Sequence, residues 1–89
     1  MKTQTRTTYS ESIAAEVRAE VARQRKTVQG LAQVLNVTQS TASRRFTGDV
    51  PFDMREIFEV AAWLGLSVTE LDRRARETRD AADHVAVSA

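Results

Sequence analysis

The sequence predicts an all-α fold, a compact bundle of five helices. Apolar residues recur three and four positions apart along most of the 89 residues, which is the period of an amphipathic helix. Valine, isoleucine and threonine never alternate with polar residues over a strand-length run. Glycine, proline and asparagine fall at the breaks between the periodic segments. A chain of this length fits one small domain.

The first expected helix opens near residue 9. Thr8 and Glu11 have the spacing of a capping box, in which each side chain accepts a hydrogen bond from the backbone N–H of the other residue. Ile13, Val17 and Val21 then recur every four residues and form one buried stripe. The preceding residues 1–8 are polar, and we expect a flexible N-terminal segment there.

Residues 28–48, VQGLAQVLNVTQSTASRRFTG, predict two short helices joined by a tight corner. Leu31 and Leu35 keep helical spacing until Asn36 interrupts it. Thr38 then offers a hydroxyl at the N-cap of the next helix, which we expect over about 38–47. The helix over 38–47 is mostly polar, which suits contact with DNA better than burial in a core.

A fourth helix follows the connection that contains Gly48 and Pro51. Asp53 and Glu56 repeat the capping-box spacing, and Gly65 is expected to end this helix in a left-handed conformation. The core-facing residues of the fourth helix are Ile57, Val60, Ala61 and Leu64.

The last helix is expected to start at Ser67 and Glu70. It continues through residues 71–85, LDRRARETRDAADHV, which are strong helix formers with few apolar residues. We expect this helix to fray near residues 85–89.

At LAQVLNVTQSTASRRFTG followed by IFEVAAWLGLSVTEL, the sequence resembles the Cro/repressor type of helix-turn-helix regulator over about residues 13–71. The resemblance implies a lambda-repressor-like fold with a DNA-binding domain at 9–71. Residues 72–89 lie beyond the resemblance and are expected to form a C-terminal helical extension. It further implies a transcriptional regulator that binds double-stranded DNA sequence-specifically, as a phage or prophage repressor or a Cro-like protein. Two residues depart from the family pattern: Asn36 stands where Gly is usual, and Arg45 where an aliphatic residue is common.

The third helix is implied to contact base edges in the major groove. Glutamine pairs with adenine and arginine with guanine through two hydrogen bonds each. The family places base-contacting residues at four positions of this chain: Gln39, Ser40, Ser43 and Arg44.

The start of the second helix is expected to bind DNA phosphates, because its first backbone N–H groups have no partner within the helix. Thr27 also caps this helix. Thr41 is assigned a phosphate or a thymine methyl group, and Arg45 a phosphate, with a solvated side chain lying over the core as the alternative for Arg45. The N-terminal segment that contains Lys2 and Arg6 is either an arm that contacts the DNA or a disordered tail. The expected phosphate ligands are Lys26, Thr27, Gln29, Thr41 and Arg45.

Charge divides unevenly along the chain. Residues 1–48 contain eight Lys or Arg and three Asp or Glu, a net charge of +5, whereas residues 49–89 contain five and nine, a net charge of −4. This asymmetry directs the half with the DNA-binding pattern toward phosphates.

Composition argues against several other classes. The absence of Cys excludes disulfides and thiolate metal sites, and no apolar run approaches membrane-spanning length. The polar N-terminus has no signal-peptide core, so we expect a cytoplasmic location. His84, the one histidine, lies in the expected tail, and the acidic pairs Asp49 with Asp53 and Asp80 with Asp83 are interpreted as solvated charges or caps. We therefore expect no enzyme activity, no cofactor, no metal and no small-molecule ligand.

The expected partner is a double-stranded DNA operator bound by two copies of the chain, since one domain contacts only a few base pairs. The homodimer forms either in solution or on the DNA. Val34 and Trp63 are either core-edge residues or partly exposed anchors. An antitoxin-like or adaptor protein that acts through its C-terminal helix is the alternative function, and a purely structural helical module is the third. The last helix is either solvated and fraying or in contact with another chain, and its candidate contacts are Leu71, Ala75, Ala82 and Val85.

Overall fold

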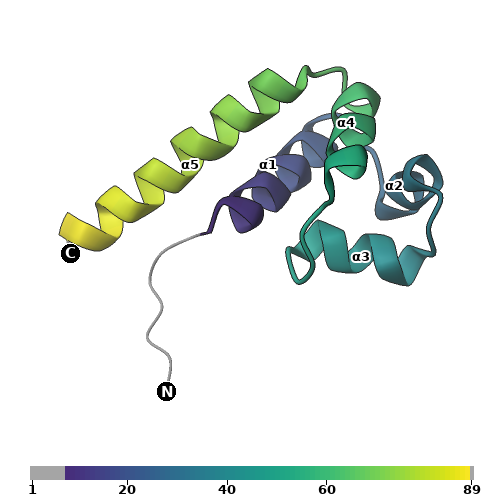
Figure 1. Cartoon of the computed structure of the whole chain (residues 1–89), viewed down its shortest axis with the longest axis horizontal. Coiled ribbons are helices and arrows are strands. Elements are labelled where there is room, and N and C mark those ends of the chain that lie inside the picture. Colours follow the sequence, from purple (N-terminus) through teal and green to yellow (C-terminus); the bar gives the residue numbers. More distant parts are fainter. Residues whose placement is uncertain (1–7, 89) are drawn as a thin grey trace.

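Five α-helices make up the described part of the protein, and no strand occurs in residues 8–88. The computed structural model describes the backbone of residues 8–88 and the side chains up to Ala81 (Figure 1). This architecture confirms the all-α, five-helix prediction. The helices are α1 (Tyr9–Arg23), α2 (Val28–Leu35), α3 (Gln39–Thr47), α4 (Met54–Trp63) and α5 (Val68–Ser88).

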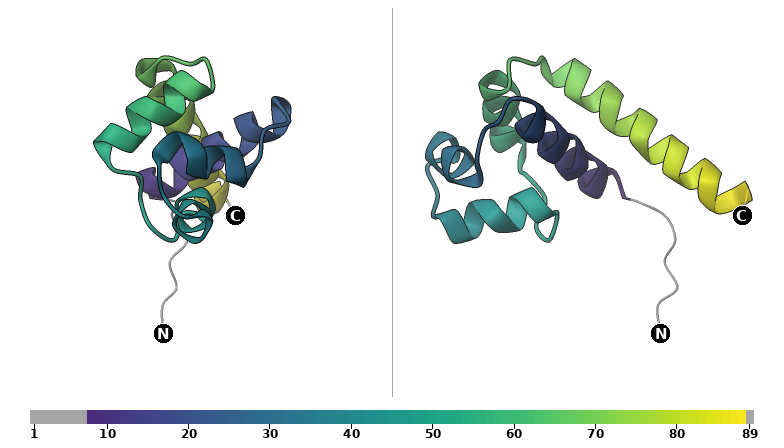
Figure 2. Two further views of the ribbon diagram at one scale, coloured as in Figure 1. Left: turned by 90° about the vertical axis from the view of Figure 1, so that its right-hand side faces the viewer. Right: turned by 180° about the vertical axis from the view of Figure 1, so that it is seen from behind.

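Helices α1 and α5 lie antiparallel, side by side, and α2, α3 and α4 surround one end of α1 (Figures 1 and 2). The expected stripe of α1 is buried, with Ile13, Val17 and Val21 at most 5% exposed. Leu71 and Ala75 of α5 pack into the same core at 1% and 0% exposure. The expectation that these two residues contact another chain is therefore wrong, because their own domain already covers them.

The predicted N-caps are confirmed at atomic level. Thr8 Oγ1 accepts from the N–H of Glu11 at 3.2 Å, and Glu11 Oε1 accepts from the N–H of Thr8 at 3.1 Å. Asp53 opens α4 with a second capping box. Ser67 Oγ accepts from the N–H of Glu70 at 3.0 Å at the start of α5. Each cap satisfies a backbone donor that the helix itself leaves free.

Helices α1, α2 and α4 end in the same backbone motif. A residue one or two positions after each helix adopts positive φ: Arg25 at 58°, Asn36 at 57° and Gly65 at 73°. The N–H of the residue after it bonds to a carbonyl five positions back, as Lys26 N does to Val21 O at 2.9 Å. Asn36 thus confirms the expected corner between α2 and α3, because asparagine tolerates this conformation better than most residues.

Several expectations lie outside what the structure describes. Residues 1–7, with Lys2 and Arg6, are not described, and neither are the side chains of Ala82, His84 and Val85. Helix α5 runs without interruption through residues 71 and 72, where we expected the DNA-binding domain to end. None of the described helices is long and apolar enough to cross a membrane.

Candidate nucleic-acid interface

Helices α2 and α3 pack closely at the corner formed by Asn36. Small side chains lie at this contact: Ala32 is 7% exposed and Ala42 is 0% exposed. Thr38 caps α3 by accepting from the N–H of Thr41 at 3.1 Å. The corner and its small residues therefore set α3 across α2 at the edge of the domain, as the left view of Figure 2 shows.

One face of α3 is exposed and polar. The four residues expected to contact bases are all solvent-exposed, and the spacing i, i+1, i+4 and i+5 places them on one side of the helix. The hydroxyl of Thr41, half-buried beside them, accepts a hydrogen bond from Thr38 Oγ1 at 3.0 Å. The face consists of Gln39, Ser40, Ser43 and Arg44.

Two arginine side chains connect the C-terminal turn of α3 to neighbouring helices. Arg18 of α1 donates through Nη1 to the carbonyl of Phe46 at 2.8 Å. Arg45 of α3 donates through Nε to Glu56 Oε1 of α4 at 3.0 Å. Arg45 was expected to face a phosphate. The structure corrects this expectation, because its Nε pairs with a carboxylate inside the domain and its side chain is only 20% exposed.

Glu56 joins three parts of the chain although its side chain is only 3% exposed. The oxygen that accepts from Arg45 also accepts from the N–H of Asp53 at 2.9 Å. A buried carboxylate needs such partners to offset the loss of hydration. The sequence indicated Glu56 as a capping residue, but nothing in the spacing pointed to Arg45, which comes from another helix.

The start of α2 presents backbone donors to solvent. Thr27 Oγ1 accepts from the N–H of Gly30 at 3.0 Å, which confirms Thr27 as the N-cap. The N–H groups of Val28 and Gln29 lie in the first turn, where no helical carbonyl is available to them. The Gln29 side chain is exposed beside them. This end of α2 has the geometry that binds anions at helix N-termini.

Lys26 lies over the indole ring of Trp63, with Nζ 5.1 Å from the ring centroid. Trp63 is half-buried and packs against the core, so it lies at the core edge as one of the two expectations had it, and Val34 is also half-buried. A Cβ added at Gly30 would come within 3.1 Å of the Trp63 ring. The absence of a side chain at Gly30 therefore allows α2 to approach Trp63 closely.

Arg25, just before α2, is a further basic residue that was not predicted from the sequence. It is exposed and holds a left-handed backbone conformation, which is unfavourable for a residue with a Cβ. Together with Lys26 it places two cations immediately before α2. The charge pattern alone could have drawn attention to it, since Arg23, Arg25 and Lys26 cluster in the sequence.

Several carboxylates of the acidic half of the chain pair with arginines of the same half. Glu70 accepts from Arg73 and Arg74, and these hydrogen bonds lower the pKa of its carboxyl from 4.5 to about 2. The hydrogen bond from Tyr9 lowers the pKa of Asp72, and the hydrogen bond from Arg76 lowers it further. Over the described residues, no group of three or more His, Cys, Asp and Glu is arranged to hold a metal ion.

The sequence pattern of the BetR domain family matches residues 7–84 of this sequence. The chain belongs to the BetR domain family. The BetR domain described here is also similar in structure to the clp gene regulator ClgR from Corynebacterium glutamicum, with a TM-score of 0.79 over 92% of this chain and 89% of that chain. Sequence identity in that pair is 21%, so the likeness establishes the helix-turn-helix fold. No curated protein matches the sequence.

Proposed function

We propose that this BetR-domain protein is a transcriptional regulator that binds double-stranded DNA sequence-specifically. The observation that carries the proposal is the exposed face of α3, whose polar side chains project from a helix fixed at both ends. Gln39 and Arg44 have the donors and acceptors that pair with adenine and guanine edges in the major groove. Ser40 and Ser43 lie between them and suit either type of base edge.

We assign binding of the DNA backbone to the start of α2 and the residues just before it. The free N–H groups of Val28 and Gln29 and the cations of Arg25 and Lys26 would bind phosphates on one side of the groove. The hydroxyl oxygens of Thr27 and Thr41 accept hydrogen bonds from Gly30 N–H and Thr38 Oγ1, and each hydroxyl would donate its own hydrogen to a phosphate. Arg45 is left out of this set because Glu56 binds its guanidinium.

The regulator is assigned to the compact repressors of the Cro type, acting as two copies on a two-fold operator. This finer assignment rests on the sequence resemblance over residues 13–71. The solved structure of ClgR supports the broader class, because that protein is described as a gene regulator. A cytoplasmic location follows from the proposed function.

The adaptor alternative receives less support from the structure. It assigned partner binding to the apolar residues of α5, but Leu71 and Ala75 pack inside the domain. Exposed residues on the first half of α5 are mostly charged, and Arg73 pairs with both Glu70 and Glu77. The described part of α5 therefore offers little apolar area to another protein.

Selection of bound sequences from a random duplex pool tests the proposal. We expect a consensus with two-fold symmetry, and an affinity for it that falls steeply as salt rises, because bound phosphates release counterions. Half-sites are expected about 34 to 36 Å apart, which is one turn of the duplex. Enrichment of no sequence, or binding that does not respond to salt, would refute the regulator.

A further inference from the structure

Helix α4 exposes an apolar stripe on the side opposite its core-facing residues. Met54 is 65% exposed and Phe58 is 56% exposed, and these are the exposed large hydrophobic residues of the described chain. Ala62 is exposed one turn further along. Residues four apart lie above one another on a helix, so Met54, Phe58 and Ala62 form a continuous stripe. Clustered exposed apolar residues mark interaction surfaces more often than single ones do.

Both signs of charge lie along one edge of the stripe. Arg55 Nη1 contacts Glu59 Oε2 at 2.8 Å, and their side chains are 61% and 36% exposed. At 100° per residue, Arg55 and Glu59 fall on the same side of Phe58. This edge is therefore neutral overall, with the positive group toward the start of α4 and the negative group toward its end.

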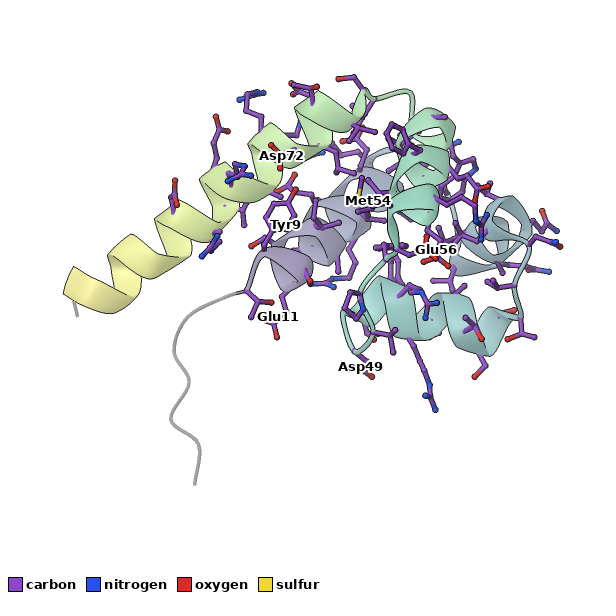
Figure 3. All side chains as sticks on the ribbon, in the orientation of Figure 1. Tyr9, Glu11, Asp49, Met54, Glu56 and Asp72 are labelled. Carbon is purple, nitrogen blue, oxygen red and sulfur yellow. The ribbon has the colours of Figure 1, made fainter. Side chains whose placement is uncertain are left out.

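A groove borders the stripe on its other side. It has a volume of about 300 Å³, lies between α1, α4 and α5, and is open to solvent. Figure 3 shows Tyr9, Met54 and Asp72, which line it together with Ile57, Val68 and Thr69. The apolar surface of α4 thus continues beyond the stripe, toward Ile57 and Val68.

We propose that the α4 stripe is a contact between two copies of this chain, with the two α4 helices antiparallel across a two-fold axis at Phe58. Such an axis places Phe58 against its symmetry mate. Met54, four residues before the axis, then lies level with Ala62 of the other copy, four residues after it. The long side chain of one copy meets the small side chain of the other.

The charged edge fits the same arrangement. A two-fold axis perpendicular to antiparallel helices brings equivalent edges of the two helices together. Arg55 lies three residues before the axis. Glu59 of the other copy lies level with the position one residue before the axis, so it is two residues from Arg55 along the helix, about 3 Å at 1.5 Å per residue. Each copy thus supplies one cation to the other and receives one, as a two-fold interface requires. A strongly acidic or basic partner finds no matching charge on this neutral edge.

The contact is expected to be weak in free solution. An aromatic side chain buries about 150 to 250 Å², whereas a stable interface buries about 800 Å² on each partner. The stripe and its groove fall short of that area, so we expect a dissociation constant in the micromolar to millimolar range. The stripe contains none of the residues assigned to DNA, so its test does not depend on the proposed function.

Sedimentation equilibrium of the full chain over a range of concentrations tests the contact. We expect a monomer–dimer equilibrium that weakens at least tenfold in Phe58→Ser, Arg55→Glu and Glu59→Arg. An equimolar mixture of the Arg55→Glu and Glu59→Arg proteins should recover wild-type association, because opposite charges then face each other at both edges. Far-UV circular dichroism of each variant checks that it is folded.

The matched control is the double reversal Arg73→Glu with Glu77→Arg on α5, an exposed pair of the same spacing with a 2.6 Å contact. It should leave association unchanged. A wild-type protein that stays monomeric to about 1 mM overturns the proposal. Association that survives Phe58→Ser, or a mixture that fails to recover it, likewise overturns the antiparallel arrangement.

Discussion

Arg45 on α3 and Glu56 on α4 form an ion pair between Nε and Oε1 at 3.0 Å, with the carboxylate almost fully buried. A second tie, from Arg18 to the carbonyl of Phe46, reaches the same turn of α3 from α1. These two bonds attach the C-terminal turn of α3 to α1 and to α4. We expect them to limit how far its exposed face can tilt.

Removing Arg45 is expected to destabilise the fold strongly. The substitution Arg45→Met leaves the Glu56 carboxylate buried without its cation, and breaking a buried pair in this way costs about 3 to 5 kcal/mol. Urea unfolding measures the loss. The matched substitution Arg55→Met, in the exposed pair with Glu59, should change the free energy of unfolding by less than about 1 kcal/mol. Equal effects of the two substitutions would contradict a structural role for the buried pair.

Glu56→Gln separates orientation of α3 from electrostatics. This variant loses a negative charge, which by itself favours binding to every DNA sequence. If the pair orients α3, affinity for the selected sequence should instead fall relative to random DNA, by about 1 kcal/mol, a typical coupling energy for residues in contact. Competition titrations well below the unfolding temperature measure the ratio. A uniform gain on both DNAs would show that the pair has no part in base recognition.

Alanine substitutions on α3 should change sequence preference. Gln39→Ala and Arg44→Ala are each expected to cost about 1 to 3 kcal/mol on the selected site and to relax preference at one position in each half-site. Lys26→Ala should weaken all duplexes alike and reduce the salt slope by about one. Repeating the selection with each variant gives the preference. If all three variants lose affinity equally on every DNA, the assignment of α3 to the major groove is wrong.

Local features of this chain followed directly from the sequence. The caps at Thr8, Thr27 and Thr38 depend on residues within three positions of each other, and the corner at Asn36 depends on one backbone conformation. Short-range hydrogen bonds of this kind leave a clear pattern in the sequence. The same holds for the exposed face of α3, which follows from helical spacing.

Contacts between helices could not be predicted in the same way. Helical spacing did not reveal the pairing of Arg45 with Glu56, which lies eleven residues away on another helix. Arg45 was therefore expected to bind a phosphate. Ala75 was expected on a partner because a narrow apolar stripe does not reveal whether α1 or another chain covers it. In each case the packing of whole helices decides the outcome.

The corner residue Asn36 should be sensitive to side-chain shape. At φ 57° and ψ 48° a β-branched residue is strained, so Asn36→Val is expected to destabilise the protein by about 1 to 2 kcal/mol. Asn36→Gly, the usual family residue, should be close to neutral, because glycine adopts this conformation freely. Thermal unfolding of both variants measures the difference. A harmless valine at this position would rule out a left-handed backbone there.

Glu70 should titrate far below an ordinary glutamate. Its hydrogen bonds from Arg73 and Arg74 lower its pKa to about 2. Because the folded pKa lies below the unfolded value of 4.5, the resulting stability is fully present above pH 4.5 and is lost as the pH falls toward 2. Carboxyl chemical shifts followed by NMR give the pKa. Arg73→Ala should raise it, and a wild-type Glu70 that titrates near 4.5 would show that these contacts do not persist in solution.

Trp63 is the single tryptophan of the sequence, and its indole lies under the ammonium group of Lys26 at the foot of α2. Indole emission depends on the charge and polarity next to the ring. Trp63 is therefore an intrinsic fluorophore beside the start of α2, the part of the protein assigned to binding the DNA backbone. If Lys26 leaves the ring for a DNA phosphate, we expect the change to appear in the fluorescence of the unlabelled chain, so that binding can be followed without attaching a dye to the surface under study.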